Sequence, residues 1–176
     1  MIGQNNGVQG ANSNNNKSRG LSAQQKEFFD FFEAKTGFRP EKMELVSISG
    51  TRSSLKTLGL ELPVFQKDLW GLLVYCGEKL FFYIHPEEYS YMGFVQKGSD
   101  ELKVKEQLIC FTDFSSFSVS VPMPRIRFLR FFCNNHILSV SVSKPTVTGE
   151  TETAVIQMQS LTKASVLQQK LQPFVR

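Results

Sequence analysis

The sequence is poor in the residues from which most catalytic and metal sites are built. It has three cysteines, Cys76, Cys110 and Cys133, which lie far apart, and two histidines, His85 and His136. There is no C-x-x-C pair, and an odd number of separated cysteines argues against a disulfide framework. We therefore expect a protein of a reducing compartment, the cytoplasm.

Motifs that mark common enzyme classes are also missing. The sequence contains no P-loop, no G-x-G-x-x-G and no G-x-S-x-G. His85-Pro86-Glu87-Glu88 is the only place where a histidine adjoins carboxylates, and no second ligand pair is spaced for zinc. Each cysteine lies in or beside an apolar strand, where a thiol is usually inert. We predict no catalytic residue, no metal and no cofactor.

Long apolar runs and concentrated charge are absent as well. No stretch approaches the roughly 18 apolar residues of a membrane span, and the polar start predicts no signal peptide. The net charge of +4 is spread thinly, and the aromatic residues alternate with aliphatic ones rather than with Lys and Arg. We expect no nucleic-acid partner, because such a surface is a concentrated basic or stacking one.

The composition of the chain predicts one globular domain that follows a polar N-terminal tail. Hydrophobic residues make up 41% of the chain, and 16 residues are Phe. Residues 1–21 are mostly Asn, Gly, Ser and Gln, so we expect a flexible tail there. Residues 22–176 form the predicted domain, with a helix at 22–36, a barrel at 43–159 and a closing helix at 161–173.

Both predicted helices have recognisable ends or faces. Ser22 followed by Gln25 is a capping-box pattern, and Gly37 is a typical C-terminal stop. In the closing helix, Leu167 and Leu171 lie on one stripe, which Phe174 continues.

Four phenylalanines crowd the first predicted helix and must be buried somewhere. Phe28 and Phe32 lie one turn apart with Phe31 beside them, and Phe29 lies further round the helix. They either pack against the core of the sheet or dock on another protein, because helices that bind in a groove use the same pattern.

The chain is organised around two apolar runs between Asp68 and Pro86. Each run has the length of a strand, and Gly77-Glu78 fits a two-residue hairpin turn with Gly first. Further strands are predicted at 43–49, 106–112, 116–121, 126–133, 136–143 and 153–159, with an edge strand within 87–101. Residues 55–65 are ambiguous and could form a bent strand. Short antiparallel strands at this spacing predict a barrel or sandwich.

The stretch from Gly71 to Phe82 resembles the first hairpin of GRAM and bacterial pleckstrin-homology (PH) domains. These families place a Gly-apolar strand, a short polar turn and then a basic-Leu-aromatic-Phe strand. Over residues 68–174, the resemblance implies a PH-like barrel of about seven antiparallel strands with a capping helix. The sequence departs from the pattern in two ways: its only Trp is Trp70, outside the last helix, and its hairpin loop, Cys76 to Lys79, is nearly neutral. Lipid binding through this loop is therefore not expected.

The best basic cluster is formed by Arg125, Arg127 and Arg130. Arg125 and Arg127 share a strand face, and guanidinium pairs suit phosphate or carboxylate. One hypothesis is a barrel that binds a nucleotide second messenger or phosphate, similar to PilZ domains, whose second element is D/N-x-S-x-x-G. Asp113 begins a partial match to that element, but Ser118 stands where Gly is expected and the preceding arginine pair is missing. Alternatively, the arginines only protect an apolar strand at its edge.

Three functional hypotheses remain open. The first is a non-catalytic cytoplasmic binding or scaffold module that acts through protein contacts at a sheet edge, the Phe-rich helix or the tail. The second is an anion-binding barrel that uses Arg125 and Arg127. The third is an enzyme of unknown class, which would need His85 or His136 close to a cysteine or a carboxylate.

Overall fold

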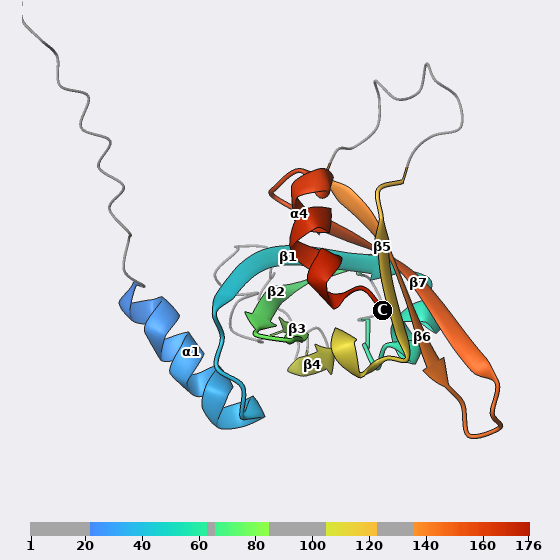
Figure 1. Ribbon diagram of the computed structural model, residues 1–176, viewed down its shortest axis with the longest axis horizontal. Helices are drawn as coiled ribbons and strands as arrows, with labels where there is room; N and C mark the ends of the chain where they lie inside the picture. The colour runs from blue at the N-terminus through green and yellow to red at the C-terminus, as the bar shows by residue number, and fades with distance from the viewer. Residues whose placement is uncertain (1–21, 63–65, 85–104, 123–135) are drawn as a thin grey trace, which may run out of the picture.

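The computed structural model describes residues 22–62, 66–84, 105–122 and 136–176. Strands dominate this part of the chain, and a helix stands near each end (Figure 1). The elements are α1 (Ala23–Thr36), β1 (Lys42–Gly50), α2 (Arg52–Thr57), β2 (Asp68–Cys76), β3 (Lys79–Ile84), β4 (Gln107–Cys110), η2 (Phe111–Asp113), β5 (Ser116–Ser120), β6 (Ile137–Pro145), β7 (Thr151–Ser160), α4 (Ala164–Leu171) and η4 (Gln172–Phe174).

The strands form one seven-stranded antiparallel sheet in the order β4-β3-β2-β1-β7-β6-β5. Strand β1 joins its two halves, because it pairs with β2 from Lys42 to Ser49 and with β7 from Val46 to Gly50. The prediction of a mainly antiparallel β fold with terminal helices is confirmed. Among the described strands, the end strands β4 and β5 do not pair with each other, so the pairing seen there does not close the sheet into a barrel.

The central hairpin and both terminal helices follow their sequence signals. Gly77 adopts a φ of 57° in the two-residue turn between β2 and β3, a conformation that glycine accepts without steric cost. At α1, the Ser22 side chain accepts from the Gln25 N–H while the Gln25 side chain accepts from the Ser22 N–H. The apolar stripe of the closing helix, ending at Phe174, is buried.

Residues 52–57 form a short helix, although the sequence suggested a loop followed by a bent strand. The Thr51 hydroxyl caps this helix by accepting from the Ser54 N–H at 3.1 Å. Leu55 and Leu58 lie one helical turn apart and are both buried. Their three-residue spacing is therefore a better guide to this segment than the alternation of apolar residues expected for a strand.

Strand β4 is also shorter than the sequence suggested, because Phe111 and Thr112 belong to η2. The strands expected within 87–101 and at 126–133 lie outside the described residues.

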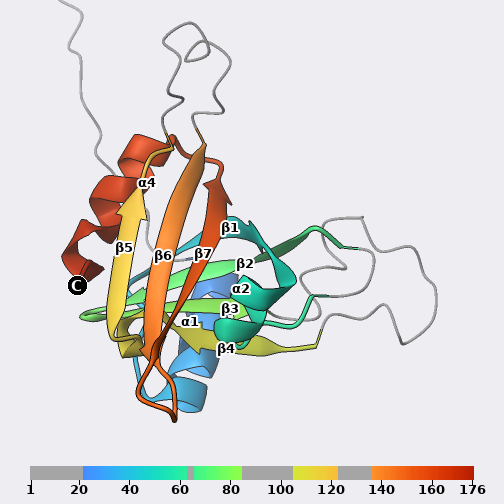
Figure 2. The same cartoon turned by 90° about the vertical axis from the view of Figure 1, so that its right-hand side faces the viewer.

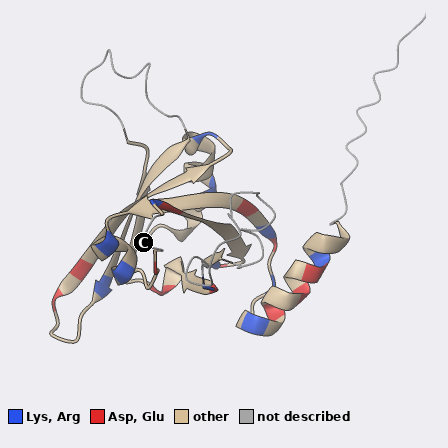
Figure 3. Ribbon diagram, turned by 180° about the vertical axis from the view of Figure 1, so that it is seen from behind, with Lys and Arg blue, Asp and Glu red and all other residues tan. Residues whose placement is uncertain are grey.

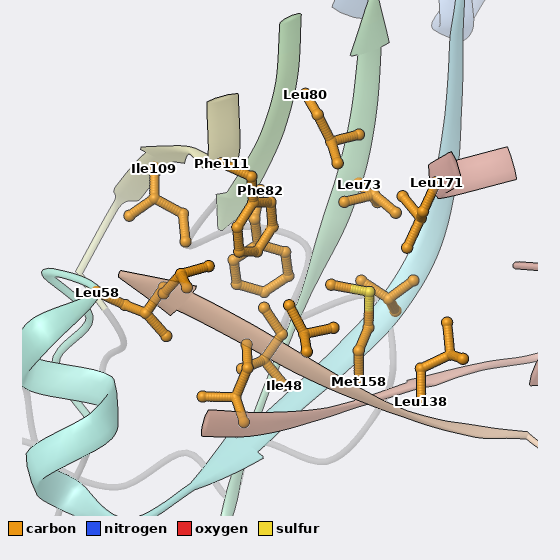
Figure 4. Packing of buried hydrophobic residues seen from close by; sticks show 14 of the residues in the cluster. Ile48, Leu58, Leu73, Leu80, Phe82, Ile109, Phe111, Leu138, Met158 and Leu171 are labelled. Atoms are coloured by element: carbon orange, nitrogen blue, oxygen red, sulfur yellow. The ribbon is translucent and has the colours of Figure 1, made fainter. Parts of the chain in front are cut away.

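Two apolar layers hold the sheet, one on each face. The larger one is the inner core, to which both halves of the sheet contribute, together with α2 and α4; Figure 4 shows Phe82, Met158 and Leu171 converging in it. The smaller layer lies on the outer face of β2 and β3, where Phe32 of α1 packs against Val74, Phe81 and Tyr83. Helix α1 thus covers the outside of one half of the sheet.

Candidate docking surface

The four phenylalanines of α1 have different environments. Phe29 and Phe32 are buried, Phe28 is half-buried and Phe31 is 43% exposed. The Phe32 ring meets the ring of Phe81 at 5.5 Å between centroids. The helix therefore uses part of its Phe cluster to pack on the sheet's outer face and leaves one ring in contact with solvent.

A chain of polar contacts fixes α1 beside β4. The Tyr83 hydroxyl donates to Glu106 Oε1 at 2.5 Å, and Lys35 Nζ contacts the same oxygen at 2.5 Å. The Lys35 ammonium also lies 5.8 Å from the ring centroids of both Phe31 and Tyr83, within the range of a cation–π attraction. Glu106 therefore links the helix to the sheet.

Three large apolar side chains stay exposed around this junction. Phe31 and Phe38 flank the packed rings of Tyr83 and Phe81, with centroid separations of 6.2 Å and 5.7 Å, and are 43% and 41% exposed. Leu108, which pairs with Tyr83 across β3 and β4, is 37% exposed. We call Phe31, Phe38 and Leu108 the α1–β4 surface. Sequence reasoning missed Phe38 and Leu108, because neither stands out from an ordinary core pattern.

The α1–β4 surface adjoins an edge of the sheet. Strand β4 pairs with β3 on one side and with no other described strand. One of its ends is fixed, because the Gln107 side-chain amide accepts from the Glu61 N–H at 2.7 Å and donates to the Glu61 carbonyl at 3.0 Å. Figure 2 shows β4 at the border of the described sheet, beyond β3. A strand at an edge offers backbone groups for pairing with another chain.

Charges around α1 are mixed in sign. Figure 3 shows acidic and basic positions interleaved along the helix, and Arg39 bridges to Glu33 at 2.5 Å. At the first residue of β3, Lys79 pairs with Asp113 at 2.6 Å and thereby lowers the pKa of that carboxyl. This mixture does not favour a strongly charged partner at α1.

The described cysteines are poor nucleophiles. Burial, followed by the charge of Glu41, raises the pKa of the Cys76 thiol to about 12, and burial also raises the pKa of Cys110. A thiol attacks as the thiolate, which is scarce at neutral pH for such groups. His136 Nδ1 lies 3.0 Å from the Thr162 carbonyl oxygen, whereas His85 and Cys133 lie outside the described residues.

The arginine cluster, Arg125, Arg127 and Arg130, also lies outside the described residues. Within the described ranges, no group of three or more His, Cys, Asp or Glu side chains could hold a metal ion. The same part of the chain has no helix long and apolar enough to cross a membrane.

One polar cluster was not anticipated from the sequence. Glu44 accepts from the Tyr75 hydroxyl at 2.7 Å through one oxygen, and Lys170 of α4 contacts its other oxygen at 2.5 Å. Lys42 lies 5.6 Å from the centre of the Tyr75 ring, and its pKa is lowered by burial and by the nearby Lys170 charge. Both Glu44 oxygens are satisfied, so the cluster joins α4 to β1 and β2.

Comparison with known proteins gave no relative. No protein-family model matches the chain, and no curated protein or solved structure matches it. Over the described residues, the fold is a seven-stranded antiparallel sheet whose end strands do not pair with each other, with α1 on its outer face and with α2 and α4 packed against its inner core.

Proposed function

We propose that this protein is a non-catalytic binding module that recognises a protein partner through the α1–β4 surface. The observation that carries the proposal is the grouping of Phe31, Phe38 and Leu108, three exposed large apolar side chains around one helix and an edge strand. Scattered single apolar residues are normal on a protein surface, whereas a group beside an edge suits an interaction site. The raised thiol pKa values of Cys76 and Cys110 add support against nucleophilic chemistry.

We further propose that the architecture is a PH-like barrel. The strand order supports this view, because consecutive strands are neighbours in the sheet except β4 and β5, which stand at its two ends, and β7 returns to pair with β1. The amphipathic helix α4, whose buried residues include Leu167 and Leu171, then closes on the inner core.

The partner that fits this surface best is an extended segment with apolar side chains. Its backbone would pair with the side of β4 that no described strand occupies, and its side chains would pack on Leu108 and Phe31. Strand addition obtains affinity from main-chain hydrogen bonds and specificity from alternate side chains. The mixed charges around Lys35 and Glu106 leave apolar contact as the main attraction.

Site-specific photo-cross-linking tests the proposal. A photoreactive phenylalanine analogue replaces Phe31 in the full chain, and in a second preparation it replaces Leu161, which is 75% exposed elsewhere. After irradiation in lysate of the source cells, we expect a discrete cross-linked protein from position 31 and none from position 161. Leu108→Ser in the first preparation should remove the product, because it deletes the apolar contact on β4.

Thermal unfolding of each preparation shows whether it is folded. A product obtained equally from both positions, or one that survives Leu108→Ser in folded protein, would contradict the proposed surface.

A further inference from the structure

The segment that follows α4 pairs with β5, one end strand of the described sheet, and contacts η2, which follows the other end strand, β4. The Phe117 N–H of β5 donates to the Arg176 carbonyl at 3.3 Å, and the Arg176 N–H donates back to the Phe117 carbonyl at 3.0 Å. Such a reciprocal pair is the hydrogen-bonding unit of an antiparallel ladder. Residue 176 therefore occupies the edge of β5 as a short added strand would.

Side chains complete the bridge to η2. The Arg176 guanidinium donates to the Thr112 carbonyl at 3.3 Å. The pKa of Asp113 is lowered mainly by its hydrogen bond with Lys79 and only to a smaller extent by the Arg176 charge. Val175 packs against the inner core, and the Phe174 ring lies 6.0 Å from that of Tyr75. One short segment thus provides backbone pairing, an apolar anchor and a positive charge between η2 and β5, a space that we call the seam.

The seam continues past the bridge. Val119 stands two residues beyond Phe117, so its backbone groups face the same edge. In place of a strand, the Gln168 side chain of α4 donates to the Val119 carbonyl at 3.4 Å. The backbone at this edge is thus covered by a side chain, which a longer added strand could replace.

We propose that the seam is a second peptide-binding site, and that Val175 and Arg176 fill it in this structure. Its ligand is an extended peptide from a partner protein that carries an apolar residue followed by arginine. The side chains of the occupant indicate the chemistry of this ligand: the apolar side chain packs against the core, and the guanidinium donates to the Thr112 carbonyl. This site is separate from the α1–β4 surface and does not depend on it.

The test weakens the contacts of residue 176 in the seam and adds, in solution, a peptide that carries the original side chains. The full chain carries Arg176→Glu, and the probe is the synthetic peptide Gln-Pro-Phe-Val-Arg, which copies residues 172–176. Hydrogen exchange at the Phe117 amide is the measurement. We expect exchange to be roughly tenfold faster in the variant, since a hydrogen bond to a charged group is lost, and millimolar peptide should restore protection.

Two controls make the result specific to the seam. Lys67→Glu changes an exposed charge by the same amount and should leave exchange at Phe117 unchanged. A peptide with Glu in place of Arg should not restore protection in the Arg176→Glu variant. The proposal is overturned if the arginine peptide fails to protect Phe117, or if both peptides protect it equally.

Discussion

Gly71 in β2 is a position where the packing of the sheet leaves no room for a side chain. A Cβ atom there would lie 2.6 Å from the Tyr83 carbonyl oxygen and 2.8 Å from the Phe82 ring. Gly71→Ala should lower the free energy of unfolding by about 1–3 kcal/mol, because β3 or the Phe82 ring must shift. Urea denaturation measures this loss. Gly50→Ala is the matched control, since its closest neighbour is a methyl group of Ile156 at 3.1 Å, and an equal loss there would contradict the explanation.

Cys76 should resist alkylation in the folded protein. Its thiol pKa is raised from 9.0 to about 12, so at pH 8 the folded protein holds far less thiolate than the unfolded chain does. We expect iodoacetamide to label Cys76 at least about 100 times more slowly than in urea-unfolded protein, as followed by peptide mass mapping. Equal rates in the two states would show that the thiol is accessible and unperturbed.

The same pKa shift has a consequence for stability. A thiol with a raised folded-state pKa contributes stability below pH 9.0, the unfolded value, and that contribution declines as the pH rises from 9.0 towards 12.

At the scale of elements, α1 is a structural cover with one exposed aromatic ring. Phe32 is fully buried against Phe81 and Tyr83, whereas Phe31 is only partly covered. Phe32→Ala should therefore cost about 3–5 kcal/mol of unfolding free energy, and Phe31→Ala should cost less than about 1 kcal/mol. Chemical denaturation of both variants tests this. If Phe32→Ala leaves stability unchanged, α1 does not fold cooperatively with the sheet.

The sequence correctly predicted those features that depend on residues close together in the chain. The capping box at Ser22, the Gly77 turn and the alternation of Leu138, Val140 and Val142 are each confirmed, because each depends on neighbours within a few residues. Helix α2 was missed, since six residues are too few for a clear periodic signal.

The arrangement of the elements could not be deduced in the same way. The sequence showed that the α1 phenylalanines need burial, but either face of a sheet can satisfy that need. Likewise, the pairing of Phe117 with Arg176 joins residues that are far apart in the sequence, and it depends on backbone atoms that carry no sequence signature. Leu108 and Phe38 look like core residues, and only the fold shows that they reach the surface.

At the scale of the whole molecule, one core connects the two halves of the open sheet. Leu73 of β2, Leu138 of β6 and Leu171 of α4 belong to the same buried cluster, and β1 pairs with a strand of each half. The halves should therefore unfold together, because neither can keep its apolar face covered without the other.

Trp70, the single tryptophan, provides a probe of one half of the sheet. We expect the urea midpoint from Trp70 fluorescence to equal the midpoint from far-ultraviolet circular dichroism, which reports on all strands and helices. Leu138→Ala, placed in the other half, should move both midpoints to lower urea by the same amount, because it opens a cavity in the shared core. If Leu138→Ala shifts the circular dichroism curve and leaves the Trp70 curve in place, the halves are independent, and the open edges between β4 and β5 mark a real division of the molecule.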